Sequence, residues 1–220
     1  MKNLKIFIAI STLIFMTHCA EKTGDGFYKG YETPSYKIIK KSENIEIRQY
    51  EKVLIAEVEV EGNREEAVRE GFMILADYIF GKNIAKEKVA MTSPVSQQLI
   101  IKGKEISEKI SMTSPVSQVA QKDKKWFIQF TMPKTFTIET LPTPQNDRIH
   151  FKNIQERKMI AIIFNGRWSD KIFNEHKEKL ENFIKENGLK TKGEMIFAYY
   201  DDPFTLPWNR RNEIIWELKN

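Results

Sequence analysis

Residues that bind transition metals are scarce in this sequence, which has one cysteine and three histidines among its 220 residues. Because one cysteine cannot form a disulfide within the chain, the fold has to depend on its apolar core. Metal centres are built mainly from several cysteine and histidine ligands. Apart from His18 and Cys19, which stand together near the N-terminus, the sequence has only His150 and His176. The sequence therefore excludes a disulfide scaffold and offers no pattern for a metal centre.

The sequence also lacks a Gly-x-Ser-x-Gly nucleophile motif and any basic run interleaved with aromatic residues. Its formal charge is +5, from 35 Lys and Arg against 30 Asp and Glu. Without Lys2 and Lys5, which lie in a segment expected to be removed, 33 basic residues face 30 acidic ones. This balance is typical of a solvated surface and not of a nucleic-acid binding stripe. We therefore expect a protein that is not an enzyme and has no nucleic-acid partner.

No apolar run reaches the roughly 20 residues that a membrane-spanning helix needs. The stretch from Ile6 to Met16 follows two lysines and resembles the apolar core of a signal peptide. Cys19 stands directly after it, where a bacterial lipoprotein carries its acylated residue. These features predict a signal peptide at residues 1–19, a lipid anchor on Cys19 in the cell envelope, and a flexible tether at residues 20–30. An ordinary secretory signal, giving a secreted protein, is the alternative.

The domain expected at residues 31–220 changes from a strand pattern to a helix pattern near residue 62. Residues 53–60 end in an alternation of apolar residues with glutamate, which predicts a strand with one buried and one wet face. The residues that follow form one helical stripe: Val68, Gly71, Phe72, Leu75, Tyr78 and Ile79. Asn63 is placed as the N-cap with Glu66 as its capping-box partner, and Gly81 is placed to end the helix.

A second helix is predicted between Ser169, as its cap, and Gly188, as its stop. Its apolar stripe contains Ile172, Phe173, His176, Leu180, Phe183 and Ile184. Each helix follows strands that end in glycine, so the two halves share a strand-strand-helix-strand order. Such a pseudo-repeat predicts an α+β fold in which one curled or closed sheet packs against two helices.

Seven residues, Met-Thr-Ser-Pro-Val-Ser-Gln, occur twice, at 91–97 and again at 112–118. Proline forbids helix at its own position and biases the residue before it toward extended backbone. Both copies therefore predict strand ends at one rim of the sheet. Their hydroxyl groups are expected to bond to nearby backbone, as serine and threonine often do beside turns.

Together with Trp-Phe-Ile-Gln-Phe-Thr-Met-Pro at 126–133 and Arg-Arg-Asn-Glu-Ile at 210–214, this repeated motif resembles the SOUL heme-binding protein family. The resemblance covers roughly residues 31–218. It implies a distorted, mostly antiparallel β-barrel flanked by two helices, in agreement with the pattern described above. It also implies non-enzymatic binding of heme or a related tetrapyrrole.

The resemblance also implies where the tetrapyrrole binds, in a cleft between the first helix and a loop near the C-terminus. The matching positions here are Arg69, Phe72, Met73 and Ala76 on the helix and Tyr200 at the loop. Arg69 offers a partner for a propionate. Asp77 opposes the assignment, because its carboxylate would repel the same propionate.

Three alternatives remain open in the sequence. His176 interrupts a helical stripe, so it is either an axial heme ligand or a packed core-edge residue, and packing is the commoner role. The Arg210–Glu213 segment either clamps a carboxylate or forms internal salt bridges, with Glu213 or with the Asp201 and Asp202 pair, and the internal role is favoured. His150 is expected on the wet side of a strand. The alternative function is a ligand-sensing or scaffold module, similar to bacterial effector-binding domains, without heme.

Overall fold

The computed structural model describes residues 26–100 and 124–219. The predicted signal peptide, the predicted anchor residue Cys19 and residues 20–25 of the tether lie outside the described residues. The second copy of the repeated motif, at 112–118, lies outside them as well. In the described part of the chain, no helix has the length and apolar character required to cross a membrane.

Residues 27–32 fold into a small hairpin where the sequence predicts the end of a tether. β1 (Phe27–Tyr28) pairs antiparallel with β2 (Tyr31–Glu32). The hairpin is held to a distant part of the chain, because Lys29 Nζ lies 2.5 Å from Asp201 Oδ1 and the Tyr28 hydroxyl donates to Asp201 Oδ2 at 3.1 Å. The folded domain thus begins earlier than the sequence predicts.

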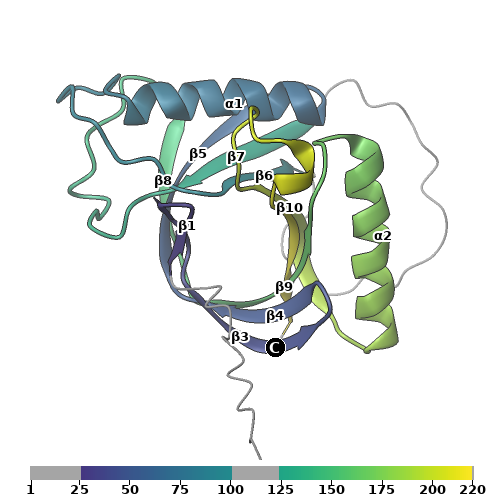
Figure 1. The fold of residues 1–220 in the computed structure, drawn as a ribbon. Coiled ribbons are helices and arrows are strands. Elements are labelled where there is room, and N and C mark those ends of the chain that lie inside the picture. Colours follow the sequence, from purple (N-terminus) through teal and green to yellow (C-terminus); the bar gives the residue numbers. More distant parts are fainter. Residues whose placement is uncertain (1–25, 101–123, 220) are drawn as a thin grey trace, which may run out of the picture.

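The main sheet contains nine strands, all paired antiparallel, in the order β3-β4-β9-β11-β10-β6-β7-β5-β8. Their bounds are β3 (Tyr36–Ser42), β4 (Ile45–Tyr50), β5 (Val53–Glu61), β6 (Val95–Ile100), β7 (Lys125–Thr131), β8 (Ile149–Ile154), β9 (Arg157–Phe164), β10 (Thr191–Tyr199) and β11 (Asn212–Leu218). The sheet is strongly curled, with α1 (Arg64–Ile79) and α2 (Asp170–Glu186) on its outer side (Figure 1). β3 and β8 are its edges, and no pairing among the described residues joins them, so closure into a barrel stays a prediction.

The strand order reveals the predicted internal repeat. The first half runs β4-β5-α1-β6-β7 and the second runs β8-β9-α2-β10-β11. In the sheet, the strands from β4 to β8 stand in the order β4-β9-β11-β10-β6-β7-β5-β8. If each strand is replaced by its counterpart in the other half, the same order is obtained in reverse. The halves are therefore related by a pseudo-twofold axis between β6 and β10. Each half has one more strand than the sequence predicts, and its first strand pairs with the other half.

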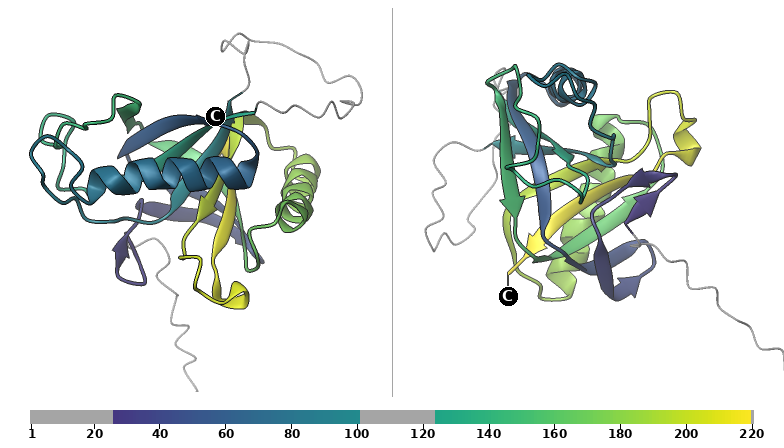
Figure 2. Two further views of the ribbon diagram at one scale, coloured as in Figure 1. Left: turned by 90° about the horizontal axis from the view of Figure 1, so that it is seen from above. Right: turned by 90° about the vertical axis from the view of Figure 1, so that its left-hand side faces the viewer.

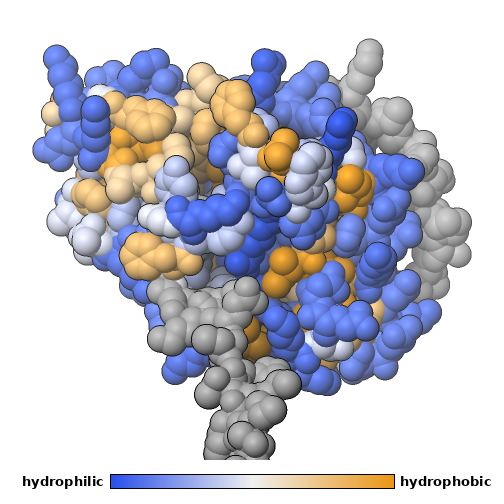
Figure 3. All heavy atoms as spheres, viewed as in Figure 1, coloured by the Kyte–Doolittle hydropathy of each residue, from blue (hydrophilic) through white to orange (hydrophobic). Residues whose placement is uncertain are grey.

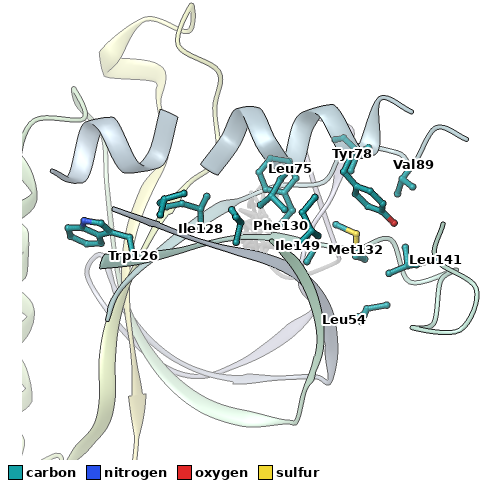
Figure 4. Close-up of a cluster of buried hydrophobic side chains, with 14 of the residues drawn as sticks. Leu54, Leu75, Tyr78, Val89, Trp126, Ile128, Phe130, Met132, Leu141 and Ile149 are labelled. Carbon is teal, nitrogen blue, oxygen red and sulfur yellow. The ribbon is translucent and has the colours of Figure 1, made fainter. Parts of the chain in front are cut away.

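Helix α1 packs on the outer face of the sheet through the apolar stripe expected from the sequence. The Asn63 side chain accepts a hydrogen bond from the Glu66 amide at 2.9 Å, and the reciprocal bond completes the capping box. Leu75 points from the helix toward Phe130 and Ile149 of the sheet, and Tyr78 points toward Met132 and Leu141 (Figure 4). The two elements approach closely because Gly71 faces Ile128, where a Cβ would meet the isoleucine side chain at 2.3 Å.

Helix α2 covers the second half of the outer face with fewer buried residues, namely Phe173, Leu180 and Ile184. Ser169 is its N-cap residue as predicted, although its side chain makes no cap hydrogen bond. The two helices are joined at their N-termini by Arg64, whose Nε donates to Asp170 Oδ1 at 2.6 Å. Nothing in the sequence pattern indicates this link, since Arg64 stands in the first turn of a helix, where an arginine is usually solvated.

The inner face of the curled sheet differs from the wet face that the sequence predicts. Glu57, on β5, is buried, and its carboxylate accepts from Gln129 at 3.1 Å and pairs with Lys152. Aromatic and apolar residues from both halves form a separate cluster on this face, with Tyr36, Tyr50, Met159 and Tyr200 among them. The curl encloses side chains that a flat sheet would leave in water, so alternation alone mispredicts their burial.

Candidate functional site

The Arg210–Glu213 segment forms internal contacts, as the sequence analysis favoured. Glu213 lies on the inner face, where Arg211 Nη2 approaches its Oε1 at 2.5 Å. A second guanidinium, that of the fully buried Arg48, binds the same carboxylate, with Nη1 to Oε2 at 2.7 Å and Nη2 to Oε1 at 3.1 Å. The Tyr200 hydroxyl donates to Oε2 at 3.1 Å. Every acceptor of Glu213 is thus occupied by the protein's own groups.

This network fixes the charge of Glu213. Burial by itself raises the pKa of the carboxyl group, but the adjacent charges of Arg48 and Arg211 outweigh that effect and lower it to about 2. Burial and the same carboxylate raise the pKa of Tyr200. Glu213 is therefore an anion at neutral pH that is neutralised within the fold, so the segment carries no free group for a ligand.

The other two residues of the segment brace the connection from β10 to β11. Arg210 Nε donates to the Thr205 carbonyl at 2.7 Å, and its guanidinium lies 4.6 Å from the ring of Trp168. Asn212 accepts from the Trp168 indole at 2.9 Å. The connection itself presents its apolar residues to solvent, with Phe204 93% and Trp208 68% exposed. Sequence reasoning missed these residues, although Phe-Thr-Leu-Pro-Trp between charged segments is a visible signal.

The first copy of the repeated motif has the structural role expected of it. Val95 begins β6, and the hydroxyls before it bond to backbone: Thr92 to the Thr131 carbonyl, and Ser93 Oγ to the Tyr200 carbonyl at 3.1 Å. Gln97 donates to the Arg64 carbonyl at 2.9 Å. These contacts connect β6 to β7, to the end of β10 and to α1.

The helix residues implied by the resemblance lie on one side of α1, at i, i+3, i+4 and i+7. Ala76 is buried, Phe72 is half-buried against Phe130, with ring centroids 5.5 Å apart, and Met73 remains 56% exposed. Arg69 is exposed, and within the described residues no carboxylate pairs with it. The arrangement offers an apolar surface with a free cation one turn away.

Further hydrophobic side chains continue this surface beyond the end of α1. Phe80 and Ile84 are 60% and 66% exposed. Figure 3 shows hydrophobic residues gathered over and beneath α1 on this face. Figure 2 shows the β10–β11 connection on the same side of the molecule, standing apart from the helix rather than packing on it. Exposed apolar residues on both elements are the expected signature of a binding surface.

Asp77 is less of an obstacle to anion binding than the sequence alone suggests. Its Oδ2 lies 2.7 Å from Lys82 Nζ, in an exposed ion pair. The lysine offsets much of the carboxylate's field at neighbouring positions. The repulsion that Asp77 would exert on a propionate is reduced accordingly.

Tyr200 is not brought together with the α1 residues. Its side chain is 8% exposed and belongs to the inner-face cluster, whereas Phe72 belongs to the outer-face cluster under α1. The Arg211 guanidinium stacks over its ring at 4.5 Å. In the loop near the C-terminus, the residues that are exposed to solvent follow Tyr200 in the chain.

His176 lies on α2 and has two internal contacts. Its Nδ1 is 2.8 Å from the Ile172 carbonyl, and its ring stacks on Phe164 at 4.0 Å. These contacts are typical of a packed core-edge residue. His150 is exposed on β8, as expected. Among residues 26–100 and 124–219, no group of three or more His, Cys, Asp or Glu side chains is placed to hold a metal ion.

The structure thus shows an α+β domain with a duplicated architecture. Residues 31–217 match the family model described as SOUL heme-binding protein. The chain belongs to this family. A curated relative, heme-binding protein 1 of Xenopus tropicalis, is 24% identical over 201 residues, which cover 89% of this chain and 96% of the relative.

Solved structures with low sequence identity share the fold. The C-terminal domain of EcmrR has a TM-score of 0.56 at 11% identity, covering 84% of this chain and 98% of that domain. A structure described as a hydrolase from Listeria innocua has a TM-score of 0.51 at 11% identity, covering 82% of this chain and 94% of that one. At these identities the likeness shows architecture alone.

Proposed function

We propose that this protein binds heme or a related tetrapyrrole on the outer surface of α1, without catalysing a reaction. The observation that carries the proposal is the combination of SOUL family membership with an exposed apolar surface beside an unpaired arginine. Apolar contact contributes about 25 cal/mol per Å² of buried surface, so a macrocycle lying on Met73 and Phe72 gains several kcal/mol without iron ligation. Arg69 supplies the charge-assisted hydrogen bond for a propionate.

In this proposal α1 provides a rigid platform for the ligand. Phe72 is fixed by its contact with Phe130, and the buried Ala76 anchors the same turn of the helix to the sheet. When bound, heme would supply the redox and ligand-exchange chemistry of its iron. The chain's own residues contribute binding and orientation.

A hemin titration followed by the Soret band tests the proposal on the full chain purified in detergent. We expect saturable binding to the wild type and at least about tenfold weaker binding to the Arg69→Glu, Met73→Glu double variant, since it removes a charge-assisted bond and apolar surface. Both residues are exposed, so the core stays intact. Lys179→Glu, an exposed charge reversal on α2, is the matched control and should bind as the wild type does.

His176→Ala separates contact from ligation. We expect it to leave the Soret titration nearly unchanged, because the imidazole is occupied by Ile172 and Phe164. If it alone abolished the shift, iron ligation on α2 would replace the α1 site. If the wild type gave no saturable shift, the heme function would fall and the ligand-sensing or scaffold alternative would take its place.

We also propose that the chain is lipid-anchored in the cell envelope through Cys19. The support is the sequence pattern of a basic start, a short apolar stretch and a single cysteine. The seven residues from Cys19 to Gly26 span at most roughly 25 Å when extended, which would hold the domain close to the membrane. Metabolic labelling with a fatty-acid analogue should mark the wild type and not Cys19→Ala. Equal labelling of both, or of neither, would overturn the anchor.

A further inference from the structure

The inner face of the curled sheet contains a second candidate site, separate from α1. A cavity of about 50 Å³ lies there and is lined by strands of both halves. Most of its wall is apolar, and the buried residues that form it include Ile55, Met159 and Ile215. Polar side chains also reach it: Ser96, Thr131 and Arg157. Apolar walls with a few convergent polar groups are the usual composition of a small-molecule site.

Arg157 is the unusual member of this wall. Its guanidinium is half-buried, and no hydrogen bond or ion pair to it is present among the described residues. Burial lowers the pKa of Arg157, with Glu217 acting in the opposite direction. Glu217 is itself paired with Lys192 at 3.0 Å. A partly desolvated guanidinium has five donors and finds no acceptor for them among the described residues, so they are open to a ligand or to water.

The other charged groups around the cavity already have partners. Glu213 is held by Arg48 and Arg211, as described above. Glu51, at the cavity mouth, lies 3.5 Å from Lys134 Nζ. Among the described residues, the carboxylate that lines the cavity faces a lysine, whereas the guanidinium of Arg157 has no counter-ion. The charge balance of the site selects an anion.

The size and lining of the cavity define the ligand further. Because about 10–15 Å³ of such accessible space holds one water molecule, a space of about 50 Å³ holds only a few, which suits a carboxylate group with a short chain and excludes a macrocycle. Carboxylates match the planar fork of arginine and can accept from a serine or threonine hydroxyl at the same time. Isoleucine and methionine favour an apolar remainder.

We infer that the inner cavity binds a small aliphatic carboxylate, with its carboxylate on Arg157 and its carbon chain against Ile55, Met159 and Ile215. Ser96 and Thr131 provide further hydroxyl donors. This site does not depend on the tetrapyrrole proposal, because it lies on the opposite face of the sheet from α1. The two ligands should therefore bind without displacing each other.

Isothermal titration calorimetry of the full chain in detergent tests this site, with sodium acetate, butanoate and hexanoate as probes. We expect saturable binding that strengthens about threefold to fourfold per added methylene until the cavity is filled. Butylammonium and butanol, which keep the chain and change the head group, should bind at least about tenfold more weakly than butanoate. Hexanoate should gain little over butanoate, because its chain is longer than the cavity. Equal binding of butanol and butanoate would overturn the role of the charge.

Matched variants locate the binding. Arg157→Met keeps a long apolar side chain and should weaken butanoate binding by about 10- to 100-fold, the value of one charge-assisted hydrogen-bonded contact. Lys158→Met makes the same charge change on the adjacent, exposed residue and should bind as the wild type does. Arg157→Lys keeps the charge without the planar fork and should give an intermediate affinity. Butanoate binding that is absent from the wild type, or undiminished in a folded Arg157→Met variant, would overturn the inference.

Discussion

The outer and inner faces of the sheet are built from alternate residues of the same strands, yet different forces stabilise them. On the outer face, Val58, Ile128 and Leu75 pack in an apolar layer beneath α1. On the inner face, Arg48 and Glu213 form a buried ion pair surrounded by tyrosines. The comparison shows that curling, and not alternation, decides what the second face of a sheet contains.

The two faces also differ in what they leave available to ligands. On the outer face, the helices cover the apolar side chains of the sheet. The surface left for binding is the solvent side of α1, with Met73 and Arg69. On the inner face, nearly all the charged groups are paired with one another, and Arg157 lies beside a small cavity. One face thus offers a broad apolar surface and the other a narrow anion site.

The largest expected effect comes from breaking the inner network. Glu213→Gln leaves the Arg48 and Arg211 guanidiniums buried without their carboxylate, which should lower the free energy of unfolding by about 3–5 kcal/mol. Urea denaturation measures this loss. Glu217→Gln on the same strand is the control, since its pair with the partly exposed Lys192 contributes less than about 1 kcal/mol. Similar losses in both variants would show that the network is no more stabilising than a surface pair.

The pH dependence of stability tests the charge of the same residue. The pKa of Glu213 is about 2 in the folded state against 4.5 for the ordinary group. Because the folded pKa is the lower one, the stabilisation is fully present above about pH 4.5 and is lost as the pH falls toward about 2. The gap between wild type and Glu213→Gln should therefore be constant near neutrality and narrow through this window. A gap independent of pH would contradict the assignment.

The outer layer should respond to loss of packing. Leu75 is fully buried beneath α1, so Leu75→Ala should lower the free energy of unfolding by about 2–5 kcal/mol. Met73→Ala removes an exposed side chain from the same helix and should change it by less than about 0.5 kcal/mol. An unchanged denaturation midpoint for Leu75→Ala would mean that this side of the helix does not face the core.

A smaller effect is expected where the helix and the sheet approach most closely. Gly71→Ala places a methyl group 2.3 Å from Ile128 Cγ1, so the helix must shift outward at a cost of about 1–3 kcal/mol. Arg69→Ala, on the exposed side of α1, should be neutral or slightly stabilising because alanine favours helix. A Gly71→Ala variant as stable as the wild type would show that the contact relaxes freely.

Much of the fold could be predicted because it depends on local patterns. The Asn63 capping box, the stripe through Leu75 and the Ser169 cap position all follow from spacing along one helix. The duplicated order of elements follows from repeated changes of hydrophobic period. The internal role of Arg211 and Glu213 was also accessible, because two residues two positions apart on a strand point to the same face.

The sequence could not predict contacts between residues far apart in the chain. Arg48 meets Glu213 and Arg64 meets Tyr199 only because the two halves exchange their first strands and place their helices side by side on one curled sheet. For the same reason Tyr200, assigned by resemblance to the α1 surface, lies on the other face of the sheet.

The sequence by itself determined the helices, the outer core and the family, since periodicity, caps and motifs are properties of short segments and of their order. Only the tertiary structure decided which charges are buried and which stay free. Burial of a charge depends on the curvature of the sheet and on partners more than a hundred residues away, as Arg48 and Glu213 show. Arg69 and Arg157 have the same side chain as Arg48, and it is their place in the fold that leaves them without a partner within the described chain.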